Sequence, residues 1–119
     1  MSRNTFDGEA IDQISEEYEG YHKSVIHEVE TAVKSDDFVI VGMAQNPFCR
    51  KARKTADTTG KPYKYLEYGS YLSAWKPRLA IKMWSGWPTF PQVFIKGKLV
   101  GGAQDLENLI KSGKFEELF

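Results

Sequence analysis

Two prolines placed just before an apolar, β-prone run constrain the fold of this chain more than any other feature. They lie in the stretch Trp87-Pro88-Thr89-Phe90-Pro91-Gln92-Val93-Phe94-Ile95. Pro91 cannot donate a hydrogen bond to a neighbouring strand, so we expect it at the start of a strand and not inside one. The run after it predicts a short buried strand, and Lys96-Gly97-Lys98 predicts a turn. Because it lies between an aromatic residue and a core strand, Pro91 is also a candidate for a cis peptide bond.

The apolar pattern of the rest of the chain predicts alternating helices and strands. Helices are expected over residues 11–33, 46–58, 71–84 and 105–110, and strands over residues 38–41, 63–68, 93–95 and 99–100. Gly20 weakens the first helix. Trp75, Leu79 and Met83 fall four residues apart, so we expect them to face the core. This order of elements indicates the α/β class.

Composition limits what the chain can do. Its 119 residues suffice for one domain. The 16 basic and 16 acidic residues cancel, which argues against binding to nucleic acid or to an anionic membrane. No apolar run is long enough to span a membrane, and the first ten residues lack the apolar core of a signal peptide. We therefore expect a soluble, cytoplasmic protein.

Cys49 is the only cysteine of the chain. An intramolecular disulfide is excluded, and His22 and His27 do not complete a metal site, so redox chemistry needs a second thiol from outside. Asn46 is a favoured helix cap and Pro47 a favoured first helical residue, which puts Cys49 in the first turn of a helix. A helix N-terminus favours the reactive thiolate, yet a lone cysteine can equally be an inert buried residue. The spacing alone leaves open whether Cys49 is a reactive thiolate or an inert buried residue.

From about Phe38 to Phe119 the sequence resembles the glutaredoxins. The resemblance rests on Trp-Pro-Thr-Phe-Pro-Gln, followed by Gly101-Gly102 and Asp105-Leu106. It implies a cis-Pro91 and a thioredoxin-like fold, with a four-stranded mixed sheet flanked by helices. An extra N-terminal helix is expected here. Residues 1–35 would form a helical extension packed on a glutaredoxin-like domain of residues 36–119.

The resemblance also implies a glutathione-binding groove. The backbone of Phe90 would bind the cysteinyl part of glutathione, next to Pro91. The γ-glutamyl end would lie at Gly102, Gln104 and Asp105, although Gln104 stands where the family usually has Asp and Asp105 can instead cap the last helix. Arg78, nine residues before Trp87, would bind the glycine carboxylate, a task that suits the planar guanidinium. Asn46 and Phe48 would complete the groove.

The segment around Cys49 fits the family in two registers. In the first, Asn46-Pro47-Phe48-Cys49 resembles Cys-Pro-Tyr-Cys, Asn46 replaces the nucleophilic cysteine, and Cys49 matches the resolving one. In the second, Pro47-Phe48-Cys49 resembles the monothiol pattern Pro-x-Cys-Gly-Phe-Ser, with Cys49 as the nucleophile. The helix-start signal favours the first register. The lysine that the family places before this loop is replaced by Met43 in one register and by Val41 in the other.

The activity implied by the resemblance is glutathione-dependent thiol–disulfide exchange. Cys49 would remove glutathione from glutathionylated or disulfide-containing proteins by a monothiol mechanism, in a monomer. Two alternatives stay open. Cys49 and glutathione could ligate a [2Fe–2S] cluster across a dimer, which has the four thiolates required. Alternatively, the chain is a degenerate glutaredoxin that acts as a binding module.

Overall fold

The central element of the structure is β1 (Phe38–Gly42), a strand of five buried residues. The computed structural model describes residues 23–71, 73 and 75–119. A continuous apolar run such as that of β1 suits a strand covered on both faces. β1 pairs in parallel with β2 (Lys64–Glu67) and antiparallel with β3 (Gln92–Ile95), and β3 pairs antiparallel with β4 (Lys98–Gly101). The sheet is therefore mixed, with the strand order β2-β1-β3-β4.

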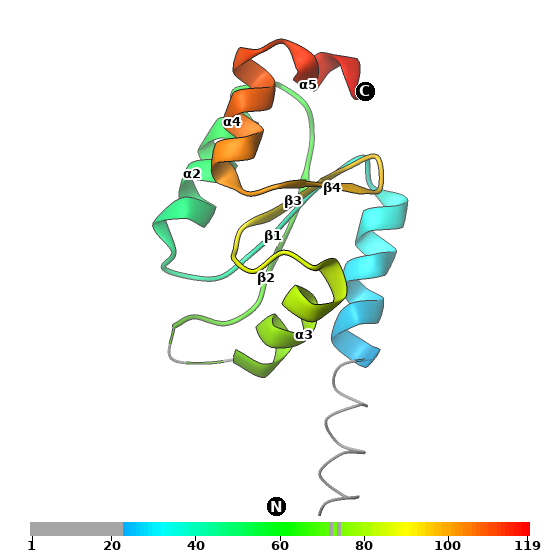
Figure 1. Cartoon of the computed structure of the whole chain (residues 1–119), viewed down its shortest axis with the longest axis vertical. Coiled ribbons are helices and arrows are strands. Elements are labelled where there is room, and N and C mark those ends of the chain that lie inside the picture. The colour runs from blue at the N-terminus through cyan, green and yellow to red at the C-terminus, as the bar shows by residue number, and fades with distance from the viewer. Residues whose placement is uncertain (1–22, 72, 74) are drawn as a thin grey trace, which may run out of the picture.

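Helices cover both faces of this sheet (Figure 1). On one face, the helix of residues 23–35 shares a buried cluster with α3 (Trp75–Ser85). On the other, α2 (Pro47–Asp57), α4 (Ala103–Lys111) and the short α5 (Lys114–Glu117) share a second cluster. Successive side chains of a strand point to opposite faces, so β1 contributes Val39 and Val41 to the first cluster and Phe38 and Ile40 to the second.

The predicted α/β order and the four-stranded mixed sheet are confirmed. The helix expected over residues 11–33 is present from residue 23 to residue 35, and its earlier part lies outside the described residues. Val25, Val29 and Val33 are buried in it, as their spacing predicts. The division of the chain at residue 35 stays a prediction. Within the described ranges, no helix is long and apolar enough to cross a membrane.

The prediction that Trp75, Leu79 and Met83 face the core is wrong. Their side chains are 61%, 38% and 70% exposed, respectively. The buried residues of α3 are Pro77, Arg78, Ala80 and Ile81. Residues four apart share one face of a helix, but their spacing does not say which face meets the sheet. In this fold Ile81 makes that contact, and the more apolar stripe is left outside.

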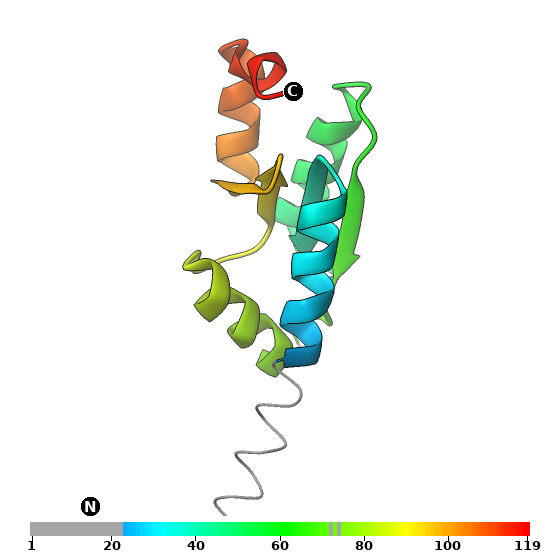
Figure 2. The ribbon, with the colours of Figure 1, turned by 90° about the vertical axis from the view of Figure 1, so that its right-hand side faces the viewer.

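The peptide bond between Phe90 and Pro91 is cis, as expected. Pro91 is fully buried and directly precedes β3, so its missing N–H removes no hydrogen bond from the sheet. Figure 2 shows how the segment between α3 and β3 crosses from the helix to the sheet. This crossing places the cis-proline at the end of the sheet where β1 leads into α2.

Candidate functional site

Asn46 fixes the start of α2. Its side-chain oxygen accepts hydrogen bonds from the backbone N–H groups of Phe48 at 2.8 Å and Cys49 at 3.0 Å. Its side-chain nitrogen donates to the hydroxyl of Tyr71 at 3.2 Å. Pro47 is the first helical residue, as predicted, so Cys49 is the third. The helix start predicted from Asn46 and Pro47 is thus confirmed, and the choice between the two family registers stays a prediction.

The thiol of Cys49 points into the protein. Cys49 is only 2% exposed and belongs to the buried cluster that includes Met43 and Phe90. The Sγ atom accepts a hydrogen bond from the backbone N–H of Met43 at 3.4 Å. Burial raises the pKa of the Cys49 thiol; the Met43 N–H opposes this shift, and the charge of Glu67 adds to it. The expectation of a thiolate stabilised by the helix start is therefore outweighed by desolvation.

Gly42 and Tyr65 shape the pocket around this sulfur. A Cβ atom at position 42 would lie 2.8 Å from the Tyr65 hydroxyl and 2.9 Å from the Cys49 Sγ, so only glycine leaves room for both groups. The Tyr65 hydroxyl donates to a Glu67 carboxylate oxygen at 3.1 Å, and the Arg53 guanidinium lies 4.1 Å from the Tyr65 ring centroid. Burial, and next the charge of Cys49, raise the pKa of Tyr65.

The cis-proline loop is held from inside by Gln92, which is fully buried. Its side-chain nitrogen donates to the carbonyl of Trp87 at 3.1 Å and to that of Thr89 at 3.4 Å. In the described part of the chain, the backbone N–H and C=O of Phe90 have no hydrogen-bond partner. The glutathione-binding prediction for Phe90 and Pro91 requires these groups to pair with an extended peptide, and no internal hydrogen bond competes for them.

The start of α4 is capped by Asp105, whose carboxylate accepts from the Gly102 N–H at 2.9 Å. This confirms that Asp105 can cap the helix predicted over residues 105–110, which is α4. A side chain at position 101, where φ is +124°, would collide with this carboxylate, because a Cβ atom there would lie 2.3 Å from it. The N–H groups of the first helical turn have no acceptor within the helix and so remain available to a carboxylate.

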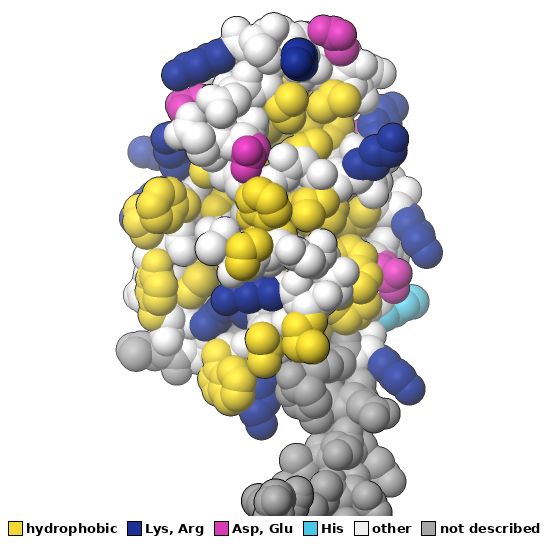
Figure 3. All heavy atoms as spheres, viewed as in Figure 1, with side chains coloured by type: hydrophobic (Ala, Val, Ile, Leu, Met, Phe, Trp, Pro, Cys, Tyr) yellow, Lys and Arg dark blue, Asp and Glu magenta, His cyan; other side chains and the backbone are white. Residues whose placement is uncertain are grey.

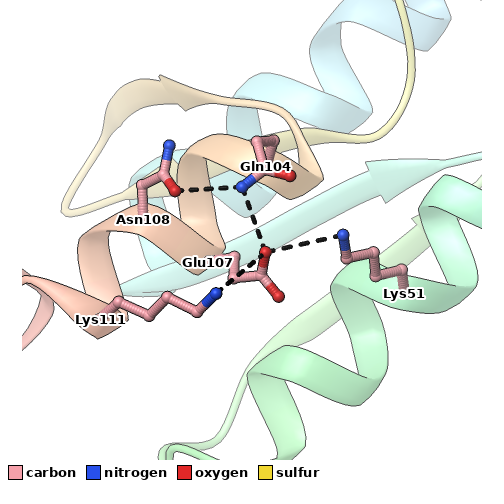
Figure 4. A network of polar contacts seen from close by, with 5 residues as sticks. All are labelled: Lys51, Gln104, Glu107, Asn108 and Lys111. Carbon is pink, nitrogen blue, oxygen red and sulfur yellow. Dashed lines mark hydrogen bonds and ion pairs between the residues drawn. The ribbon is translucent and has the colours of Figure 1, made fainter.

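The side chain of Gln104 forms hydrogen bonds to other side chains of α4 (Figure 4). Its side-chain nitrogen donates to Glu107 at 3.1 Å and to Asn108 at 3.0 Å. The same Glu107 oxygen lies 3.7 Å from the Lys51 ammonium and 3.8 Å from that of Lys111. The Gln104 side chain thus belongs to a network that ties α4 to α2.

Arg78 is buried beneath the segment that leads into α3. It is 8% exposed, and one guanidinium nitrogen donates to the carbonyls of Tyr68 at 3.1 Å and Ser73 at 2.6 Å. In this arrangement the guanidinium anchors the backbone before α3. Its role in binding the glycine carboxylate stays a prediction.

The roles in glutathione chemistry predicted for Asn46, Cys49, Phe90 and Asp105 stay predictions. The sequence pattern did not indicate the residues that lie around the thiol. Gly42 and Tyr65 lie beside the Cys49 sulfur, and Tyr71 bonds to Asn46. No spacing in the sequence links these three residues to Cys49. Phe48 is 62% exposed beside the helix start. His27 is exposed, whereas His22 lies outside the described residues. In the part of the chain that the structure describes, no group of three or more His, Cys, Asp or Glu side chains could hold a metal ion.

Comparison with known proteins agrees with this geometry. A model of the glutaredoxin family matches residues 38–100. A "Glutaredoxin-like protein" of Dictyostelium discoideum is 46% identical over 102 residues, which cover 86% of this chain and 83% of that protein. "Monothiol glutaredoxin-4" of Schizosaccharomyces pombe is 31% identical over 77 residues; these cover 65% of this chain but only 32% of that longer protein.

The fold is similar to that of a solved structure titled "Crystal structure of buckwheat glutaredoxin-glutathione complex". The TM-score is 0.71, with 23% identity, over 84% of this chain and 91% of that one. Together with the family match, this likeness settles the class: the chain belongs to the glutaredoxin family and has the thioredoxin-like fold. It is a member with one cysteine, Cys49.

Proposed function

We propose that this protein is a cytoplasmic, monomeric, glutathione-dependent thiol–disulfide oxidoreductase that acts by a monothiol mechanism. Its substrates would be glutathionylated or disulfide-containing proteins. The observation that carries the proposal is the position of Cys49, the only thiol of the chain, which lies in the first turn of α2 and in the same buried cluster as Phe90. Membership of the family supports glutathione as the co-substrate.

The described residues fit glutathione in two places. The free backbone groups of Phe90 can pair with the cysteinyl part, and the first turn of α4, after Gly102, can accept a carboxylate. Glutathione supplies the second thiol that this chain lacks. Arg78 fits less well, because binding a carboxylate would require its guanidinium to leave the carbonyls of Tyr68 and Ser73.

The chemistry of Cys49 is a pair of thiol–disulfide exchanges. The Cys49 thiolate attacks the glutathione sulfur of a mixed disulfide, and the target protein leaves as a thiolate that takes up a proton. A free glutathione thiolate then attacks the sulfur bound to Cys49. Cys49 is released as a thiolate, and glutathione disulfide is formed.

Burial makes the first of these exchanges slow. Cys49 must be deprotonated and reach an incoming disulfide, but it is 2% exposed and its pKa is raised. The first turn of α2 or the backbone at Met43 therefore has to move before reaction. We expect turnover that is limited by this opening and that increases toward alkaline pH.

The test is glutathione-dependent reduction of a glutathionylated peptide by the wild-type protein, by Cys49→Ser and by Arg78→Met. Wild-type turnover that disappears in Cys49→Ser is the expected result. Absence of turnover above the uncatalysed rate in the wild type would sink the oxidoreductase proposal. Arg78→Met separates two roles: loss of glutathione affinity with normal stability indicates a ligand contact, and loss of stability indicates the anchor seen here.

A second candidate is a degenerate glutaredoxin that binds glutathione without turning it over. Asn46 favours this reading, because it occupies the helix-cap position with two N–H groups directed at its side chain. Calorimetric binding of glutathione without turnover would support it. In Asn46→Cys these N–H groups would stabilise a thiolate at the cap, and this variant should then gain activity.

The described residues do not fit a [2Fe–2S] cluster. A bridging cluster needs the Cys49 sulfur at the surface between two chains, whereas this sulfur points into the core and is hydrogen-bonded to Met43. We therefore assign it no role in the mechanism.

A further inference from the structure

The zero net charge of the chain conceals two parts of opposite charge. Residues 1–22 contain six acidic residues and one basic residue, Arg3, which gives a formal charge of −5. Because the whole chain has 16 residues of each sign, residues 23–119 contain 15 basic and 10 acidic residues, a formal charge of +5. The six acidic residues are Asp7, Glu9, Asp12, Glu16, Glu17 and Glu19. Such an asymmetry favours contact between the two parts.

Residues 6–21, which we call the acidic segment, also contain large apolar side chains at intervals. Its large apolar residues are Phe6, Ile11, Ile14, Tyr18 and Tyr21. A segment that combines carboxylates with aromatic and branched residues is suited to an apolar surface with a basic border. The described part of the chain has such a surface.

This surface is the outer face of α3, which we call the α3 face and define by Trp75, Leu79 and Met83. These three side chains form an exposed stripe at four-residue steps. Successive residues of a helix are about 100° apart, so Lys76 lies on one side of the stripe and Lys82 on the other. Figure 3 shows hydrophobic side chains beside Lys and Arg side chains over this region. The stripe is larger than the single exposed apolar residues of an ordinary surface.

The described chain begins beside α3, on the side of the helix opposite the α3 face. In both ribbon views α3 lies beside the first described turns of the helix 23–35, and Val25 and Val29 share a buried cluster with Ile81 (Figures 1 and 2). Residues 6–21 span roughly 24 Å as a helix and roughly 50 Å when extended, whereas α3 is only about 16 Å long. Gly20, which weakens the predicted helix, is the point at which the segment would turn back onto α3. The acidic segment is therefore long enough to reach the whole α3 face from residue 22.

We propose that residues 6–21 bind the α3 face of the same chain. Their apolar side chains would cover Trp75, Leu79 and Met83, and their carboxylates would lie beside Lys76 and Lys82. Tyr71, which bonds to Asn46 at the start of α2, lies only four residues before Trp75. The bound segment would therefore border the candidate site, although the proposal does not depend on the activity proposed above.

The test places a photoreactive probe on the α3 face of the full-length chain. Leu79→p-benzoylphenylalanine and Met83→p-benzoylphenylalanine are irradiated at low protein concentration, and the linked peptides are identified by mass spectrometry. Both positions are exposed, so either probe can be accommodated without disturbing the core. The matched control is the same substitution at Thr58, an exposed position at the other end of α2.

The expected result is monomers in which position 79 or 83 is linked to residues 6–21, with no such link from position 58. Combining each probe with Asp12→Asn, Glu16→Gln, Glu17→Gln and Glu19→Gln should lower the yield about threefold or more, as should roughly 0.5 M salt. Absence of these links from both probes would overturn the proposal. Covalent dimers would show that a second copy occupies the face instead, and a yield unaffected by charge or salt would overturn the electrostatic argument.

Discussion

Replacement of Asn46 by alanine tests how the start of α2 protects the thiol. The substitution removes two hydrogen bonds to the first turn of the helix, at 2.8 and 3.0 Å, and one to Tyr71. Loss of a helix cap costs about 0.5–2 kcal/mol, and the upper end applies here because Asn46 is buried and satisfies two N–H groups. We therefore expect Asn46→Ala to lower the free energy of unfolding by about 2 kcal/mol.

The same loss should increase the reactivity of Cys49. The backbone N–H of Cys49 donates one of the two hydrogen bonds that the Asn46 side chain accepts, so opening of the capped turn exposes the thiol. A change of 2 kcal/mol in that opening equilibrium corresponds to roughly a 30-fold higher rate of thiol modification, when opening is local and fast. With a urea dependence of roughly 1.5 kcal/mol/M, the unfolding midpoint should fall by roughly 1.3 M.

Two measurements on each variant check this reasoning. Urea unfolding followed by circular dichroism gives the stability, and reaction of Cys49 with an aromatic disulfide reagent gives its accessibility. Asn46→Asp is the matched control, because it keeps the oxygen that accepts both N–H groups and should stay near the wild type in both measurements. If Asn46→Ala loses stability as expected but its thiol reacts no faster than that of the wild type, the idea that the capped turn protects Cys49 is refuted.

Two further substitutions probe the surroundings of the thiol. Gly42→Ala should destabilise the protein by about 1–3 kcal/mol, because the new Cβ would collide with the Tyr65 hydroxyl and the Cys49 sulfur. In a Tyr65→Phe background the loss of stability should be smaller. Thermal unfolding of both pairs of proteins measures these losses, and equal losses would contradict the steric account. Cys49→Ala tests the raised thiol pKa. Since the folded state holds the proton more tightly than the unfolded state, Cys49 contributes stability that is present below the unfolded thiol pKa and is lost as pH rises toward the folded value. The stability advantage of the wild type over Cys49→Ala should therefore shrink above about pH 8.5, and a constant difference across that range would argue against a buried, protonated thiol.

Several elements of the fold could be predicted because their signals are local. Asn46 and Pro47 start α2 through hydrogen bonds and a backbone angle that span a few residues. The apolar run of β1 and the proline before β3 are equally local, and both elements lie where the sequence indicates. Asp105 caps α4 by a bond to a residue only three positions away.

The predictions that failed or stayed open depend on contacts between distant segments. The spacing of Trp75, Leu79 and Met83 defines a face of α3 correctly, but the sheet contacts the opposite face, where Ile81 lies. Likewise, the sequence places Arg78 where relatives carry an arginine. It does not show that the guanidinium of Arg78 already donates hydrogen bonds to carbonyls of the preceding segment.

By itself, the sequence determined the order of helices and strands, the cap of α2, the proline before β3 and the presence of a single thiol. Local backbone preferences and short-range hydrogen bonds are sufficient for these features. Only the tertiary structure decided the environment of that thiol, because Gly42, Met43 and Tyr65 reach it from a different part of the chain. Their packing removes water from the sulfur, and this desolvation sets the protonation and accessibility of Cys49.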